Sequence, residues 1–261
     1  MSIRTTAIVN LKGGVAKTTT VINIAAILAR DHNVRVLVTD ADSQCNLTEF
    51  FGADSDRGNL SHILRNAKHF DDPGDYAAAF IQKTRYANLS ILPGDEELMD
   101  LDLSKVEQEM VSANVLAYLT KQVEGKFDYH LIDCPPAFNA ASAAALIAAD
   151  DVLIPIKLDA FSLRGMANLM RQIKNMRKIN PRLKVSGILP TMWYNSPKIV
   201  DAETQLREAG LHLFHHIRRS DKVDDMTFEQ EPLLVCSPNS AAGVDYRRFV
   251  REYVGGAESG L

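Results

Sequence analysis

The sequence contains no uninterrupted apolar stretch of about 18 residues, the length that a membrane-spanning helix needs. It also lacks a charged leader followed by an apolar run and a small-residue cleavage site. Cysteine is scarce: Cys45, Cys134 and Cys236 are widely spaced, and no Cys-x-x-Cys pair indicates zinc or redox chemistry. We therefore expect a soluble, cytoplasmic protein with buried free thiols.

Nothing in the sequence divides the chain into parts. There is no internal repeat, no low-complexity tract and no linker rich in glycine, serine and proline. With 261 residues, of which 46% are hydrophobic, the chain can bury a substantial core. We predict a single domain over residues 1–261, with a loosely held tail from residue 255 onward.

Acidic residues outnumber basic ones, and the formal net charge of −4 argues against a protein that coats nucleic acid with its whole surface. The charge is unevenly spread. Residues 1–160 hold 14 Lys and Arg against 22 Asp and Glu, whereas residues 161–261 hold 15 against 11. Any surface that binds a polyanion is therefore expected in the carboxy-terminal part, with ordinary scatter on solvated helices as the alternative explanation.

Short apolar runs alternate with segments whose apolar residues recur every three or four positions. The runs indicate buried strands at residues 7–9, 34–38, 89–92, 129–132, 152–156, 185–189 and 211–217. This alternation predicts an α/β fold with a mostly parallel, twisted sheet of about seven or eight strands and helices on both faces. Ligands bind such sheets at the carboxyl ends of the strands. The irregular stretch 52–87 is expected to be a surface excursion with short helices.

A glycine-rich segment lies between the first predicted strand, residues 3–10, and a predicted helix, residues 18–30. Backbone N–H groups of such a turn form a nest for an anion, and the start of the helix adds partial positive charge beneath phosphates. We expect Lys17 to reach the β- and γ-phosphates of ATP, and the Thr18 hydroxyl to complete the coordination of Mg²⁺. The nucleotide-binding residues of this loop are Lys12, Gly13, Gly14, Val15, Ala16, Lys17, Thr18 and Thr19.

The segment departs from the pattern G-x-x-x-x-G-K-[ST], because Leu11 and Ala16 stand where that pattern has glycine. What remains is Lys-Gly-Gly-x-x-Lys-Thr-Thr, which opens with a second lysine, Lys12. It resembles the deviant phosphate loop (deviant Walker A motif) of the ParA/MinD family of ATPases, in the SIMIBI class, and most of all the short ParA/Soj branch. The resemblance implies a P-loop NTPase fold and a nucleotide-sandwich dimer, in which Lys12 of each subunit reaches the phosphates bound by the other.

Two predicted strand ends carry the acidic residues of this resemblance. Residues 38–48 resemble the family segment D-x-D-x-Q-x-N-x-T, in which Asp42 matches the carboxylate that orients the attacking water. Residues 129–136 resemble the Walker B element. In-line attack on a γ-phosphate needs a positioned water and an acceptor for its proton, so carboxylates suit this place. The resemblance implies Thr18, Asp40 and Asp133 at the Mg²⁺ site, and Lys12, Lys17 and Asp42 as catalytic residues.

Weaker matches follow the sixth and seventh predicted strands. Trp193 corresponds to a family loop near the adenine, where stacking on the base and a packing or dimer-contact role both remain open. Arg218 and Arg219 begin a segment that closes over the adenine in the family, and Lys222 falls at a position that presents a basic residue to DNA. The DNA-binding residues implied are Arg219, Lys222, Arg247 and Arg248.

By this resemblance, the chain is expected to be a DNA-partitioning ATPase with weak intrinsic turnover. ATP would form a homodimer that binds non-specific DNA on the nucleoid without touching a membrane, and a ParB-type centromere-binding protein would stimulate hydrolysis and release it. A MinD-like membrane-cycling ATPase is a first alternative, but residues 253–261 do not suggest the basic amphipathic helix that it needs. A nucleotide-dependent adaptor that positions other cargo and never touches DNA is a second alternative, which the sequence leaves open.

Overall fold

Seven strands form one sheet in the computed structural model, which describes residues 2–108 and 110–258. Every neighbouring pair of strands is parallel except the pair at one edge, where β3 runs antiparallel to β4. The predicted α/β fold with a mostly parallel sheet is confirmed. Across the sheet the order is β3 (Gln82–Lys83), β4 (Leu89–Leu92), β2 (Val36–Asp40), β5 (Tyr129–Asp133), β1 (Arg4–Ile8), β6 (Asp151–Lys157) and β7 (Lys184–Thr191).

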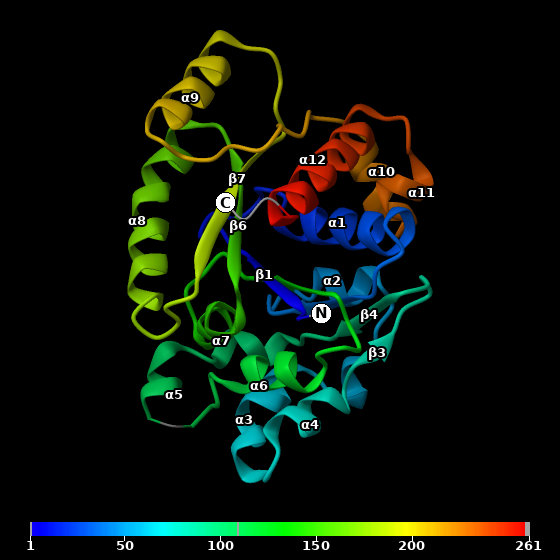
Figure 1. Ribbon diagram of the computed structural model, residues 1–261, viewed down its shortest axis with the longest axis vertical. Coiled ribbons are helices and arrows are strands. Elements are labelled where there is room, and N and C mark those ends of the chain that lie inside the picture. The colour runs from blue at the N-terminus through cyan, green and yellow to red at the C-terminus, as the bar shows by residue number, and fades with distance from the viewer. Residues whose placement is uncertain (1, 109, 259–261) are drawn as a thin grey trace.

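Helices cover both faces of this sheet and enclose a separate hydrophobic core on each (Figure 1). The first core is closed by α1 (Lys17–Asp31), α2 (Asn46–Phe50), α10 (Lys222–Glu229), α11 (Leu233–Cys236) and α12 (Ala241–Glu258). The second is closed by α3 (Leu60–Asn66), α4 (Pro73–Ala78), α5 (Leu103–Glu107), α6 (Val115–Gln122), α7 (Ala140–Ala148), α8 (Ala160–Met176) and α9 (Pro197–Glu208).

The apolar spacing read from the sequence explains this layering. In α1, residues such as Val21, Ile24 and Leu28 recur at helical spacing and are fully buried against the sheet. In β2, all five side chains are buried, as expected for a central parallel strand with helices on both sides. The stretch 52–87 contains the predicted short helices, α3 and α4, together with the 3₁₀ turns Ser55–Arg57 and Ala67–His69. It is not a surface excursion, however, because Leu60, Ile63 and Leu64 of α3 are fully buried in the second core.

One expectation about the carboxy-terminal part is wrong. Residues 211–217 form no strand, although isolated bridges join Leu213 to Ile188 and Arg218 to Trp193. The ladder is interrupted because Pro190 of β7 has no N–H to donate, so it only accepts a bond from the Ile217 N–H at 2.8 Å. Helix α12 extends to Glu258, and residues 259–261 lie outside the described part, so the loosely held tail from residue 255 onward stays a prediction.

The cysteines and the long helices can be compared with what the sequence lacks, a Cys-x-x-Cys pair and a long apolar stretch. All three cysteines are free; Cys134 is buried, whereas Cys45 and Cys236 are only half-buried. Within the described residues, no helix is both long enough and apolar enough to cross a membrane.

A histidine lies in the centre of the sheet, where it is fully buried in β5. His130 Nε2 lies 2.8 Å from the Thr39 hydroxyl in β2, and its Nδ1 lies 3.0 Å from the Thr120 hydroxyl in α6. Burial lowers the pKa of His130 to about 3. The ring is therefore neutral in the folded protein at every pH above this value, and it joins the sheet to the helix layer through two hydrogen bonds.

We predict that the stability of the protein falls as the pH falls below about 6.5, because the unfolded chain then binds a proton that folded His130 cannot bind. The His130→Gln variant keeps the hydrogen-bonding capacity without the titration. Urea unfolding at pH 7, 6 and 5 should show the stability difference between the two proteins narrowing toward low pH, by up to about 1.4 kcal/mol per pH unit. Parallel pH profiles would refute the role of His130.

Candidate nucleotide-binding site

The phosphate loop joins β1 to α1 at the carboxyl edge of the sheet. Gly14 and Ala16 are both left-handed, with φ values of 68° and 64°. Helix α1 then begins at Lys17; no side chain caps it and no acidic residue occupies its first turn. The first N–H groups of α1 and the positive end of its dipole therefore remain available for an anion, as the sequence predicts.

Strand register brings two carboxylates together beside this loop, because Asp40 of β2 pairs directly with Asp133 of β5. Asp40 Oδ2 accepts hydrogen bonds from the Thr48 N–H at 2.8 Å and from the Thr48 hydroxyl at 2.7 Å, and Oδ1 accepts one from the Asp42 N–H at 3.2 Å. Burial raises the pKa of Asp40 to about 6, against the opposing effect of Thr48. Both oxygens of Asp40 thus hold the loop after β2 in place.

Asp133 is also fully buried, and within the described structure neither of its carboxylate oxygens accepts a hydrogen bond of good geometry, although the Thr18 side chain lies close enough to favour the charged form. Burial, and then the charge of Asp40, raises the pKa of Asp133, whereas Thr18 and Lys17 act in the opposite direction. A buried carboxylate without partners is costly, and a hard cation offsets that cost. The residues present therefore fit Mg²⁺, with Asp133 and Thr18 facing the ion and Asp40 supporting the loop.

Lys17 lies among these acids and is itself buried. Its ammonium donates a hydrogen bond to the Lys12 carbonyl at 3.2 Å. Burial lowers the pKa of Lys17, while the nearby carboxylates of Asp133 and Asp42 act to raise it. Asp42 is nearly buried, and its Oδ1 accepts a bond from the Gln44 N–H at 3.1 Å. Lys17, Asp42 and Asp133 therefore meet at one point, as expected for a phosphate-transfer site.

Lys12, the second lysine of the loop, is engaged within its own subunit. Its Nζ lies 2.7 and 2.9 Å from the two carboxylate oxygens of Asp159 and donates to the Ser162 hydroxyl at 3.1 Å. Asp159 is also the amino-terminal cap of α8, where it accepts bonds from the N–H groups of Phe161 and Ser162. Sequence reasoning missed Asp159, and the signal that could have found it is the preference for aspartate at the amino-terminal cap of a helix.

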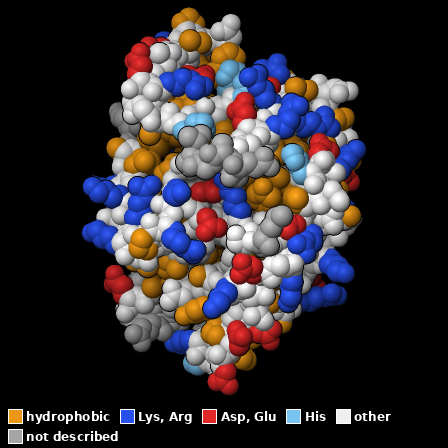
Figure 2. Space-filling model, in the orientation of Figure 1, with side chains coloured by type: hydrophobic (Ala, Val, Ile, Leu, Met, Phe, Trp, Pro, Cys, Tyr) orange, Lys and Arg blue, Asp and Glu red, His pale blue; other side chains and the backbone are white. Residues whose placement is uncertain are grey.

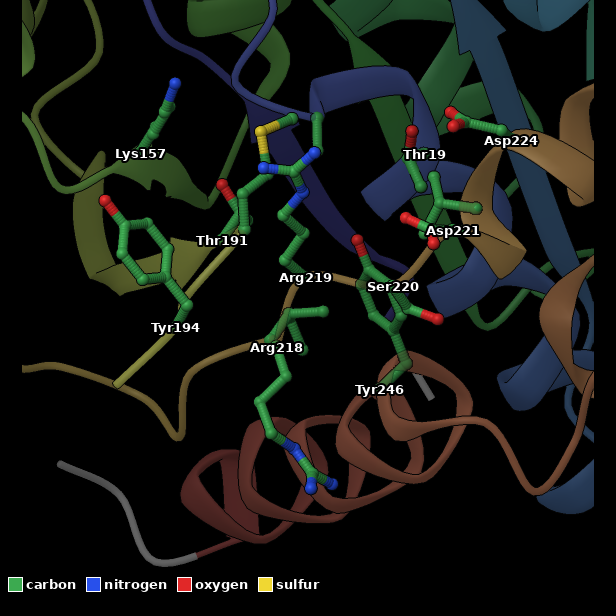
Figure 3. A pocket seen from close by; sticks show the side chains of 14 residues that line it. Thr19, Lys157, Thr191, Tyr194, Arg218, Arg219, Ser220, Asp221, Asp224 and Tyr246 are labelled. Carbon is green, nitrogen blue, oxygen red and sulfur yellow. The ribbon is translucent and has the colours of Figure 1, made fainter. Parts of the chain in front are cut away.

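A cavity of about 620 Å³ opens beside the phosphate loop (Figure 3). The loop and α1 contribute Ala16 and Thr19, and the ends of β6 and β7 contribute Lys157 and Thr191. The opposite wall consists of the segment before α10, the first turn of α10 and helix α12. This wall contains Ile217, Arg218, Arg219, Ser220, Asp221, Val223, Asp224 and Tyr246. A nucleoside attached to phosphates in the loop would extend into this space.

Trp193 does not line the cavity. Its indole N–H donates to Glu203 at 3.1 Å, and its ring stacks on His216 at 3.9 Å, which leaves the packing role and removes the stacking on a base. The neighbouring Tyr194 lines the cavity instead. Arg218 forms a bidentate pair with Asp245 of α12, whereas Figure 3 shows Arg219 extending into the cavity toward Thr191.

The other cations expected to bind DNA each lie beside a carboxylate. Lys222 is 2.6 Å from Asp225, which is three residues away on the same helix. Arg247 and Arg248 form longer pairs, at 3.4 Å, with Asp31 and Glu252 respectively. These pairs neutralise much of the surface on which the sequence places the DNA contacts.

The fold and the site together define a nucleotide-binding ATPase of the P-loop class. A family model described as an AAA domain matches residues 3–185. The chromosome partitioning protein ParA of Caulobacter vibrioides is 32% identical over 266 residues, covering 97% of this chain and 94% of that protein. The chain therefore belongs to the ParA/MinD family of ATPases with a deviant phosphate loop, as the sequence indicates.

Solved structures support the same conclusion. Apo McdA of Cyanothece superimposes with a TM-score of 0.81 at 25% identity, over 97% of this chain and 100% of that one. Cobyrinic acid a,c-diamide synthase of Mycobacterium smegmatis, with bound ADP and magnesium, superimposes with a TM-score of 0.79 at 27% identity, over 99% and 97% of the two chains. Nucleotide and magnesium therefore bind to a relative with this fold.

We predict that the Ala16→Gly variant is more stable than the wild-type protein by about 1 kcal/mol, because glycine adopts a left-handed conformation without the steric cost that alanine bears. It should also hydrolyse ATP faster and accept more nucleotides, since the Ala16 side chain borders the cavity. Urea unfolding and steady-state turnover check both effects. Ala16→Val is the control and should lose stability. Equal turnover and nucleotide preference in the glycine variant would show that this methyl group does not tune the site.

Proposed function

We propose that this chain is a ParA-type partitioning ATPase that dimerises on ATP. The observation that carries the proposal is the position of Lys12, the lysine that opens the phosphate loop. Its ammonium group lies at the protein surface, where it pairs with the Asp159 carboxylate. Membership of the ParA/MinD family and the 32% identity to a chromosome partitioning protein support it. In this proposal, Lys12 contacts the nucleotide of a second subunit.

The residues of the site suit hydrolysis of a terminal phosphate. The uncapped start of α1 and the ammonium of Lys17 bind and orient the phosphates, and Thr18 and Asp133 hold the metal. Bound Mg²⁺ would neutralise charge that develops on the phosphate oxygens. Asp42, fixed through its bond from the Gln44 N–H, orients the attacking water and accepts its proton. The cavity beyond Ala16 receives the adenosine.

Dimerisation requires Lys12 to leave Asp159. Both side chains are about one-third exposed, at 36% and 29%, so solvent screens the pair. Such a pair contributes no more than about 1 kcal/mol, which phosphates of a second subunit readily exceed. The contact with Asp159 therefore keeps Lys12 at the proposed dimer face, but it is weak enough for Lys12 to exchange Asp159 for a phosphate.

In the proposed cycle, the ATP-bound dimer binds non-specific DNA, and a ParB-type centromere-binding protein stimulates hydrolysis and release. Arg219, Lys222, Arg247 and Arg248 are the DNA contacts that the resemblance implies. Because binding to duplex DNA displaces counterions, it should weaken steeply with salt. The ion pairs of three of these cations favour a second candidate function, that of a cargo-positioning ATPase that does not bind DNA.

We predict that Asp42→Ala lowers ATP hydrolysis by about 100-fold or more while ATP binding and dimerisation persist, because only the positioning of water is lost. Lys17→Gln should instead lose most of its nucleotide affinity. A fluorescent ATP analogue, sedimentation velocity and phosphate release measure the three properties separately. Unchanged turnover in the Asp42 variant would contradict its assigned role.

We also predict that Asp159→Asn strengthens dimerisation with a slowly hydrolysed ATP analogue by up to about fivefold, since Lys12 loses an exposed ion pair. Asparagine keeps the helix cap, so the urea midpoint should stay within error of the wild-type value. Sedimentation velocity over a concentration series measures the dimer. Weaker dimerisation in this variant would mean that Asp159 supports Lys12 in the dimer as well.

A further inference from the structure

The segment from residue 160 to residue 200 carries eight basic residues and no aspartate or glutamate. It comprises α8, the turn after it, β7 and the start of α9. The rest of the chain mixes the two signs of charge, and its overall charge is −4. An acid-free stretch of this length therefore gives one side of the molecule a positive potential that the net charge conceals. The basic residues are Arg164, Arg171, Lys174, Arg177, Lys178, Arg182, Lys184 and Lys198.

The structure turns part of this segment into a continuous surface, which we call the α8 strip. Arg171 and Lys174 are one helical turn apart on the same side of α8, and Lys178 lies in the turn that directly follows the end of the helix at Met176. Figure 2 shows Lys and Arg side chains gathered at the left margin of the molecule, where Figure 1 places the end of α8. The strip comprises Arg171, Lys174, Arg177, Lys178, Arg182 and Lys184, all of them exposed.

No ion pair joins the strip to a carboxylate among the described residues. Arg171 donates only to the Asn168 side chain at 2.8 Å, and Arg177 Nε donates to the Leu183 carbonyl at 2.9 Å, which fixes the turn after α8. This contrasts with Lys222, Arg247 and Arg248, each of which lies beside an acid. A cation without an acidic partner gives up no ion pair when it meets a phosphate.

From this placement we propose that the α8 strip is the surface that binds duplex DNA, through its phosphates and without regard to sequence. A row of cations along a helix and the following turn can neutralise several phosphates of a DNA duplex, and such contacts do not depend on the base sequence. A lipid surface fits less well, because an interfacial helix buries large apolar side chains on the face that it presents. On the strip, the only large apolar side chain exposed among the described residues is Ile179.

The assignment rests on the proposed function, because it gives the ATP-bound dimer its DNA-binding face. It also suggests a route by which nucleotide binding could affect that face. Helix α8 starts at Asp159, which holds Lys12 of the phosphate loop, and the strip begins further along the same helix. A dimer presents two strips, so DNA affinity rises with dimerisation even without a change of fold.

The test compares three variants that each lose three cations. The strip variant carries Arg171→Gln, Lys174→Gln and Lys178→Gln, and the carboxy-terminal variant carries Lys222→Gln, Arg247→Gln and Arg248→Gln. The matched control replaces Lys83, Lys121 and Lys126 by glutamine, since these lysines are exposed and lie away from both surfaces. Each protein is titrated into a fluorescent duplex of random sequence with ADP or a slowly hydrolysed ATP analogue, across a salt series. Sedimentation velocity verifies dimer formation, and flotation with phosphatidylserine vesicles tests a lipid surface.

We expect the strip variant to dimerise normally and to bind the duplex at least about tenfold more weakly. Because a dimer loses three cations from each of its two strips, the slope of log affinity against log salt should become shallower by about five. The control should match the wild-type protein. Wild-type affinity in the strip variant, or a loss confined to the carboxy-terminal variant, would overturn the assignment. Vesicle binding that needs the strip, in the absence of duplex binding, would overturn it too.

The same titration separates this assignment from the proposed function. If the wild-type protein bound DNA through the strip equally well with ADP and with the ATP analogue, and stayed a monomer, the nucleotide cycle would fail and the strip would stand. If the wild-type protein bound no duplex with either nucleotide, both would fail.

Discussion

Buried charge at the carboxyl edge of the sheet is the constraint on which the rest of the structure depends. Parallel pairing places Asp40 beside Asp133, and the loop after β1 brings Lys17 close to Asp133 and Asp42. Thr48 satisfies Asp40, whereas the two buried oxygens of Asp133 accept no hydrogen bond of good geometry in the described structure and have only the Thr18 side chain and the Lys17 ammonium nearby to offset their charge. The desolvation of a buried carboxylate costs free energy unless a ligand offsets it, and a phosphate group with its bound cation would do so here. The central strands, the uncapped start of α1 and the loop conformation all serve this one point.

The ion pair between Lys12 and Asp159 is a surface contact and contributes much less energy than the buried charges do. Lys12 rests on Asp159 in a pair that water screens, whereas Lys17 lies buried among acids. An exposed pair contributes about 1 kcal/mol at most, but a charge-assisted bond to phosphate in a closed interface contributes more. In the proposed function, this difference lets Lys17 stay with the nucleotide of its own subunit while Lys12 exchanges Asp159 for the nucleotide of the second subunit. Asp159 also caps α8, so Lys12 contacts the first turn of the helix whose far end begins the α8 strip.

Local sequence signals predicted most of this fold, and long-range contacts account for what they missed. Strands such as Leu89–Leu92 and the phosphate loop follow from residues close together in the chain. The segment 211–217 has the apolar pattern of a strand, but Pro190 on the neighbouring β7 interrupts its ladder. Trp193 and Tyr194 differ by one position, and only the tertiary fold determines which of them faces the cavity. The pairs of Arg218 with Asp245 and of Arg247 with Asp31 join distant segments. The acid-free run 160–200 was visible in the sequence, but charge counted over two halves of the chain concealed it.

The central claim is that Lys12 acts on the nucleotide of a second subunit, and subunit mixing tests it most directly. Lys12→Ala and Lys17→Ala proteins are each assayed for ATP hydrolysis and then combined. In a mixed dimer, the Lys12→Ala subunit keeps its own Lys17 and receives Lys12 from its partner, so one complete site returns. The account predicts that the mixture hydrolyses ATP faster than the sum of its two components. Activity equal to that sum, under conditions in which sedimentation detects mixed dimers, would contradict it.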